Sequence, residues 1–333
     1  MIKRILYIIV LINLYHGQIS GQDVSFSQFY ANPLYLNPAF AGSVSVPRVA
    51  LQYRNQWHSF NNAYSTYSFA FDAPVKALQG GIGFNVLSDI QADGLLKSLQ
   101  FNLAYSVYIK LSRNYRLYGG IQAGLHSNML NVGDLVFADN LDPNFGNHGT
   151  TAEVFSDPTY NYPDFSTGFI VFSEKVFYGL AAHHLTEPQQ TYYRGSENPG
   201  KLYRKYSAHF GARLPVYRHG HLRKKFDVSP QIVMQKQADF YQLNYGIFAT
   251  KFGMTGGAWF RQNFGLRYDA VILLIGFVKS NIQITYSYDL TISGLWGDSG
   301  GTSEISVAFL LKEIKKKNTW PFFSPYREKF GSR

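Results

Sequence analysis

The chain has 333 residues and a formal net charge of +10; it is 17% aromatic, only 16% charged, and contains no cysteine. The absence of cysteine excludes a disulfide framework, a thiolate metal site, a cysteine nucleophile and a lipid anchor on an N-terminal cysteine. Soluble domains average ~25% charged residues, so this aromatic, charge-poor composition favours either an exported all-β protein or a membrane β-barrel.

The first 21 residues predict a signal peptide. Lys3 and Arg4 precede an apolar run at 5–15, and small or polar residues then lead to an expected cleavage site near Gly21-Gln22. The alternative is a membrane anchor helix, but the apolar run falls well short of the ~20 residues that span a bilayer. We therefore expect the mature chain to leave the cytoplasm.

Residues 22–47 are rich in aromatic and aliphatic side chains but contain Asn-Pro twice. Proline lacks an N–H and restricts its predecessor, so we expect an irregular segment with no helix or central strand. Its exposed apolar surface would be adhesive unless buried, which favours an internal plug or latch entering at the periplasmic mouth. The alternative is a strap packed under the periplasmic turns. The plug residues are Asn32, Pro33, Leu34, Tyr35, Asn37, Pro38 and Phe40.

Two stretches, 98–111 and 281–293, alternate apolar and small or polar residues for longer than the five or six residues typical of soluble strands. A tilted membrane strand needs ~9–11 residues, so their length favours a transmembrane barrel. The apolar faces, expected toward lipid, include Leu99, Phe101, Leu103, Tyr105, Ile284, Tyr286 and Tyr288.

The same alternation predicts an all-β transmembrane antiparallel β-barrel over residues 48–312 with about 14 strands. The expected strands are 48–57, 63–73, 80–89, 98–111, 115–130, 164–173, 176–185, 203–215, 226–236, 240–252, 254–262, 269–278, 282–293 and 302–312. With a periplasmic N-terminus, the longest connections, 131–163 and 186–202, face outside, as is typical of outer-membrane barrels. The connection 216–225 is longer than a periplasmic turn should be. A basic, aromatic tail, 313–333, follows the barrel.

The face expected to line the lumen carries small and polar residues, which predicts a cavity with an occupant. The candidates for contact with that occupant are Gly120, Gln122, Gly124, Gln283, Thr285, Ser287 and Asp289.

No catalytic, cofactor-binding or metal-binding residue is expected. His183, His184 and Glu187 suggest a metal site, but neighbouring residues on a strand point to opposite faces. A set of acids in the long connection could bind Ca²⁺, although their spacing fits no EF-hand: Asp134, Asp139, Asp142, Glu153 and Asp157. The basic clusters at 223–225 and 312–317 point to lipid phosphates or an acidic periplasmic partner, with no nucleic acid expected.

Several stretches resemble the PorP/SprF family of outer-membrane proteins of the type IX secretion system of Bacteroidetes. They are FSQFYANPLYLNPAFAG (26–42), YGLAAHHLTEP (178–188), KLYRKYSAHFGARL (201–214), SPQIVMQKQADFYQLNYG (229–246), GAWFRQ (257–262), ITYSYDLTISGL (284–295) and GTSEISVAF (301–309).

The resemblance implies a non-enzymatic barrel in the outer membrane of a Gram-negative bacterium. Such a barrel assists export or surface attachment of type IX cargo, such as large adhesins used in gliding motility. The implied partners are the C-terminal domain of an adhesin-like cargo protein, outer-membrane lipid and periplasmic components of the secretion system. Two alternatives stay open at this point: a passive porin or small-solute transporter, and an outer-membrane hydrolase, for which no catalytic group has a partner.

Overall fold

The computed structural model describes residues 23–311 apart from 45, 61–62, 136–140, 143–145, 148–157, 174, 193–199, 218–223, 264–267 and 295. The expected signal peptide, 1–21, and C-terminal tail, 313–333, therefore lie outside the described residues. Within the described part of the chain, no helix is both long enough and apolar enough to span a membrane.

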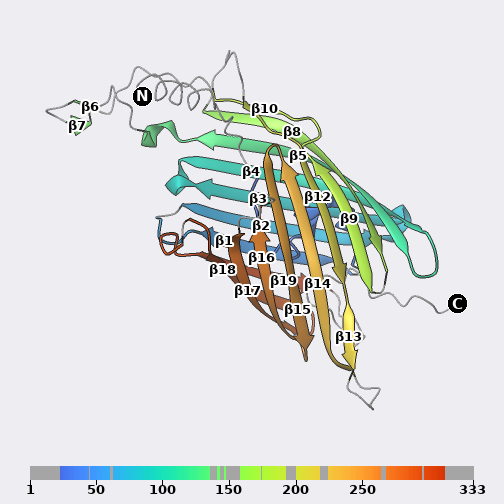
Figure 1. Cartoon of the computed structure of the whole chain (residues 1–333). Coiled ribbons are helices and arrows are strands. Elements are labelled where there is room, and N and C mark those ends of the chain that lie inside the picture. The colour runs from blue at the N-terminus through green and yellow to red at the C-terminus, as the bar shows by residue number, and fades with distance from the viewer. Residues whose placement is uncertain are drawn as a thin grey trace, which may run out of the picture.

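Long antiparallel strands close into a single barrel (Figure 1). Strands that follow one another in the ring are paired, and β1 closes the ring against β19. This confirms the fourteen-stranded antiparallel barrel that the alternation predicts, with β12 and β13 sharing one place because both pair with β14. The strands are β1 (Arg48–Gln56), β2 (Tyr64–Val75), β3 (Gly80–Gln91), β4 (Leu96–Lys110), β5 (Arg116–Leu130), β8 (Thr159–Phe172), β9 (Val176–His183), β12 (Lys205–Ala212), β13 (Leu214–Tyr217), β14 (Lys224–Gln237), β15 (Phe240–Lys251), β16 (Met254–Gln262), β17 (Tyr268–Lys279), β18 (Ile282–Thr291) and β19 (Thr302–Leu310).

The remaining elements are short. Two hairpins lie in the two longest connections: β6 (Leu141–Asp142) with β7 (Gly146–Asn147), and β10 (Gln189–Gln190) with β11 (Gly200–Lys201). The helices in the described part of the chain are single turns: α2 (Pro33–Leu36), η1 (Pro38–Phe40), η2 (Lys76–Leu78), η3 (Ala92–Gly94) and η4 (Val132–Asp134). We call the end of the barrel that carries these two longest connections the long-loop end, and the opposite end the short-turn end.

The alternation along β4 separates the two faces of the wall. Leu103 is 66% exposed on the outer face, whereas its neighbour Asn102 is 3% exposed and points inward. Along β18, Ile284 and Tyr286 are exposed and Ser287 is fully buried. Side chains of successive residues point to opposite faces of a strand, so an apolar outer wall and a polar inner wall follow directly from the sequence pattern.

Several strands extend beyond their predicted limits. β8 begins at Thr159, before the expected start at 164, although Pro163 lies within the added stretch. Over 159–166 the strand pairs with β5 alone, because pairing with β9 begins only at Thr167. A proline is tolerated where one side of a strand has no neighbour. β13 and β14 also extend into the predicted connection 216–225. The connection between these two strands is therefore shorter than predicted and covers only 218–223.

The N-terminal segment, residues 23–44, lies inside this ring. It contacts inward-facing side chains on strands from all round the barrel, including Ser68 on β2, Ser106 on β4, His183 on β9 and Ser287 on β18. Those strands lie on different sides of a closed ring, so only an interior position allows all these contacts.

The segment runs from one end of the barrel to the other. Asp23 contacts His184 and Lys205, which flank the long β9–β12 connection, and Gly42 contacts Asp72 near the short-turn end. The expectation that this segment enters at the short-turn mouth is therefore wrong. Its first described residue lies at the long-loop end.

Candidate functional site: the barrel interior and its N-terminal segment

The two Asn-Pro pairs each begin a short helical turn. Asn32 caps α2 by accepting a hydrogen bond from the Tyr35 backbone N–H at 3.3 Å, and Asn37 caps η1 by accepting one from Ala39 at 2.9 Å. Proline is well suited to the first helical position, where no N–H partner is required. The expectation that no helix forms here is therefore wrong: proline excludes a helix interior but favours a helix start.

The apolar side chains of the segment pack on apolar groups of the inner wall. Leu34 and Phe40 are each 1% exposed. Phe29 meets Trp259 edge-to-face at 4.8 Å between ring centroids, and Tyr30 meets Phe248 at 5.1 Å. This packing gives the barrel a hydrophobic core made of Phe29, Tyr30, Leu36, Ala39, Phe40, Tyr118, Ile170, Phe172, Phe177, Val233, Phe248, Trp259, Ile272 and Leu274.

A buried network of charges holds the segment near Ser27. Glu304 accepts hydrogen bonds from the backbone N–H groups of Ser27 and Gln28, both at 2.8 Å. Arg54 forms an ion pair with Glu304 at 3.0 Å, and Arg261 forms one with Asp289, also at 3.0 Å. Two cations thus balance two anions, as buried charges require.

Of this network only Asp289 is among the predicted site residues, although the sequence carries a signal for Arg54 and Glu304 as well. Arg54 and Glu304 fall on the polar parity of their strands, so the alternation alone assigns them to the inner face. The sequence does not predict their partners, because Ser27 and Gln28 belong to the N-terminal segment, which forms no strand and so has no predictable register with the wall.

Small residues on the inner wall lie where the segment comes closest. A side chain at Gly120 would overlap the backbone of Pro38 and Ala39, and one at Gly168 would overlap the Asn37 amide. Gly42 has a φ of +59°, a conformation that glycine adopts without strain, and it packs against Gly81 of β3.

The seven residues expected to line the lumen all lie on the inward parity of β5 and β18. Gly120 touches the segment, Ser287 accepts a hydrogen bond from the Gln28 amide at 3.0 Å, and Asp289 joins the charge network. Thr285 is 1% exposed, and Gln122 and Gln283 are half-buried. Gly124 leaves space for Asn102 and His126, whose side chains would collide with a larger residue there.

The adjacent histidines do not point to opposite faces, contrary to the expectation for a strand. β9 ends at His183, and His184 has a left-handed φ of 56°, which turns its ring back inward. Both rings are buried: His183 contacts Ser166 and the Leu36 carbonyl, and His184 contacts Asp23 and Asp164. Glu187 is not part of this group, because it pairs with Lys201 at 2.7 Å.

Asp23 and His184 form a charged pair at the long-loop end. Burial alone would raise the pKa of Asp23, but His184 and Lys205 hold it well below its usual value. Burial would likewise lower the pKa of His184, but the carboxylates of Asp23 and Asp164 raise it to about 9. The first described residue of the segment is thus held electrostatically.

The structure does not test the acidic residues considered as Ca²⁺ ligands. Asp139, Glu153 and Asp157 lie outside the described residues, and the structure does not describe the side chains of Asp134 and Asp142.

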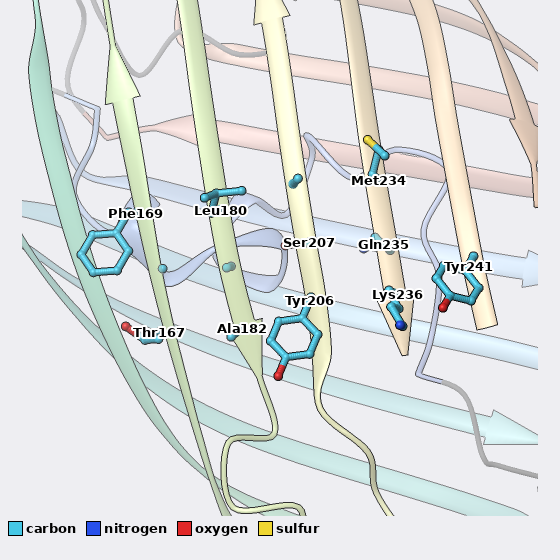
Figure 2. Close-up of a pocket in the computed structure, with 13 residues that line it drawn as sticks. Thr167, Phe169, Leu180, Ala182, Tyr206, Ser207, Met234, Gln235, Lys236 and Tyr241 are labelled. Carbon is cyan, nitrogen blue, oxygen red and sulfur yellow. The ribbon is translucent and has the colours of Figure 1, made fainter. Parts of the chain in front are cut away.

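The outer wall carries an apolar hollow of about 470 Å³ across β8, β9, β12, β14 and β15 (Figure 2). Small outward-facing residues, including Ala182 and Ala208, form its floor. Phe169, Leu180 and Tyr206 are each at least half exposed and line it. A wall of this kind suits contact with hydrocarbon.

A closed antiparallel ring with an exposed apolar wall and a polar interior is the architecture of an outer-membrane β-barrel. A family model described as "Type IX secretion system membrane protein PorP/SprF" matches residues 19–309. The chain belongs to this family, as the sequence motifs indicate, and is a protein of the outer membrane.

Solved outer-membrane barrels resemble the fold at low sequence identity. The CymD monoaromatic hydrocarbon channel is 10% identical with a TM-score of 0.46, covering 86% of this chain and 93% of its own. A Pseudomonas aeruginosa FadL homologue is 11% identical with a TM-score of 0.42, covering 85% and 94%. The KdgM porin is 9% identical with a TM-score of 0.35, covering 79% and 98%. The comparison with curated proteins found no match.

Proposed function

We propose that this barrel assists the export or surface attachment of particular type IX cargo, such as large adhesins, and that its N-terminal segment is a plug that closes the lumen. The observation that carries the proposal is the occupied interior. The segment runs between the two ends of the barrel, its apolar side chains pack on the inner wall, and Ser27 and Gln28 bind a balanced charge network. A passive porin needs an open aqueous path, which this arrangement does not favour.

The long-loop end is the better cargo site. Gly120, Ser287 and Asp289 already contact the chain's own N-terminal segment, so a cargo peptide in the lumen would have to displace those contacts first. The two longest connections, 131–158 and 184–204, need no such exchange. Glu187, Lys201 and Arg204 form ion pairs that brace the second of them. We expect these connections to face the cell exterior, because long external loops are typical of outer-membrane barrels.

The test is made in cells that lack the protein and are complemented with variants. Replacing residues 143–157 with a Gly-Ser linker leaves every barrel strand intact, and the matched control replaces the short turn 112–114 with Gly-Ser. Barrel assembly is measured by heat-modifiable gel mobility, and surface cargo by protease shaving of intact cells. We expect both variants to assemble and only the long-connection variant to lose a subset of surface proteins.

A surface proteome that is the same with and without the protein would overturn the export role. Equal cargo from both replacement variants, alongside a clear loss in cells lacking the protein, would instead move the cargo site away from the connection 131–158.

A further inference from the structure

Three buried side chains on neighbouring parts of the wall converge near the long-loop end. His126 comes from β5, Asp164 from β8, and His184 follows the end of β9. One donor atom from each lies within 4.8 Å of the other two. The three side chains are 3%, 2% and 4% exposed, and no part of the proposed cargo role uses them.

The hydrogen bonds around His126 leave one ring nitrogen available. Its Nε2 lies 3.1 Å from Oδ1 of Asn102, an acceptor, so Nε2 carries the proton and donates. Its Nδ1 then presents a lone pair, and it has no hydrogen-bond partner among the described residues. Oδ1 of Asp164 is also without a partner within the described part of the chain. A buried unsatisfied polar atom costs ~1–3 kcal/mol, so two such atoms in one buried cluster indicate a missing ligand.

His184 has the complementary arrangement. Its Nε2 lies 2.8 Å from Asp23 and its Nδ1 lies 3.1 Å from Asp164, so the protonated ring donates to both carboxylates, and a bound metal ion would replace the Nδ1 proton. In both rings Nε2 is bonded to another residue, which leaves Nδ1 as the nitrogen for a metal ion. Metal-bound histidines typically donate their other N–H to a carboxylate, carbonyl or amide oxygen in this way.

We propose that His126, Asp164 and His184 bind a divalent transition-metal ion of the Zn²⁺ type. Two imidazoles and one carboxylate suit zinc, and an ion at the centre of the three donors needs only a sub-ångström closure to reach ~2.0–2.2 Å. The ion satisfies both orphan atoms. Once the ion has replaced the proton of His184, the ion and Lys205 together face the two acids Asp23 and Asp164, so the carboxylates stay balanced by cations.

The site would also join the N-terminal segment to the wall. Asp23 belongs to that segment, and through His184 it becomes part of the outer coordination shell. Metal binding should therefore hold the start of the segment in place. The metal site stands independently of the cargo role, because it rests only on these buried side chains.

The test uses the full mature barrel purified in detergent without a polyhistidine tag and treated with EDTA. Zn²⁺ is added, free ion is removed, and bound zinc is measured by elemental analysis. We expect one zinc per barrel in the parent and at least a tenfold loss of bound zinc in His126→Asn and Asp164→Asn.

The matched control is His209→Asn. His209 is a buried, inward-facing histidine that stacks on Phe40, away from the proposed ligands. It should retain one zinc. A Co²⁺ absorption spectrum reports coordination as a second readout, and heat-modifiable mobility verifies folding of each variant.

Two results would overturn the proposal. One is a parent barrel that retains no zinc above the detergent blank, and this result does not depend on any variant folding. The other is a folded His126→Asn or Asp164→Asn barrel that retains as much zinc as the parent.

Discussion

Glycine occupies inner-wall positions where the N-terminal segment touches the barrel. The sequence shows only that small residues recur at the inward parity of β3 and β5. The structure explains why these residues are small: the backbone of Ala39 packs against Gly120, and Gly42 packs against Gly81. The lining that predicts an occupied cavity from the sequence fits a segment of the same chain.

Gly120→Ala should therefore destabilise the barrel. The added methyl group would overlap the backbone of Pro38 and Ala39, and overpacking of this kind costs about 1–3 kcal/mol. The measurement is the free energy of unfolding in urea with detergent or lipid present. The matched control is Gly256→Ala on the outer wall, where a methyl group meets nothing within 4 Å. Glycine is the weaker residue in a strand by ~0.5–1 kcal/mol, so the control should be neutral or slightly stabilising. Equal stability of the two variants would contradict the close approach.

At the level of strands, alternation was sufficient to predict the fold. Fourteen antiparallel strands follow from apolar residues at every second position, and so do the two faces of β4, β5 and β18. The misses have local causes. β8 continues through Pro163 because that stretch of the strand pairs with β5 alone. His184 turns inward because its backbone has a left-handed φ, which the sequence pattern does not predict. The buried ion pairs Arg54–Glu304 and Arg261–Asp289 join residues from different strands. The alternation within each strand predicts that these side chains face inward, but it does not predict which of them pair.

Leu103→Arg tests the outer face of β4. Leu103 is 66% exposed at the middle of the strand, where arginine facing lipid should cost ~2–4 kcal/mol. Ile109→Arg is the matched control, because Ile109 is 59% exposed on the same face but one residue from the strand end, where the cost falls to ~0–1 kcal/mol. Unfolding in lipid vesicles measures both. Equal costs at the two positions would mean that the middle of β4 does not lie at the bilayer midplane.

For the whole molecule, the central question is whether the barrel is open or filled. A fourteen-stranded ring lies between small barrels packed with side chains and large ones with a channel. Here, apolar residues of the N-terminal segment pack into a core with the inner wall, and polar ones bind a charge network beside it. These contacts support the proposal that the segment closes the lumen.

The final prediction distinguishes a plugged barrel from a passive porin. The parent should be silent in planar bilayers, whereas Leu34→Asp combined with Phe40→Asp should conduct. Both side chains are 1% exposed, so two buried carboxylates would expel the segment while the strands stay unchanged. Leu78→Asp, at a turn position that is 47% exposed, is the control and should stay silent.

A chemical probe of the same state is available because the chain has no cysteine. In the parent background, Ala39→Cys should resist a maleimide reagent, since Ala39 is fully buried, whereas Ala77→Cys in the exposed turn η2 should react. In the Leu34→Asp, Phe40→Asp background, Ala39→Cys should become reactive as conductance appears. Steady conductance from the parent, together with a reactive Ala39→Cys, would show that the segment leaves the lumen unaided, and the passive porin would then be the better account of the protein.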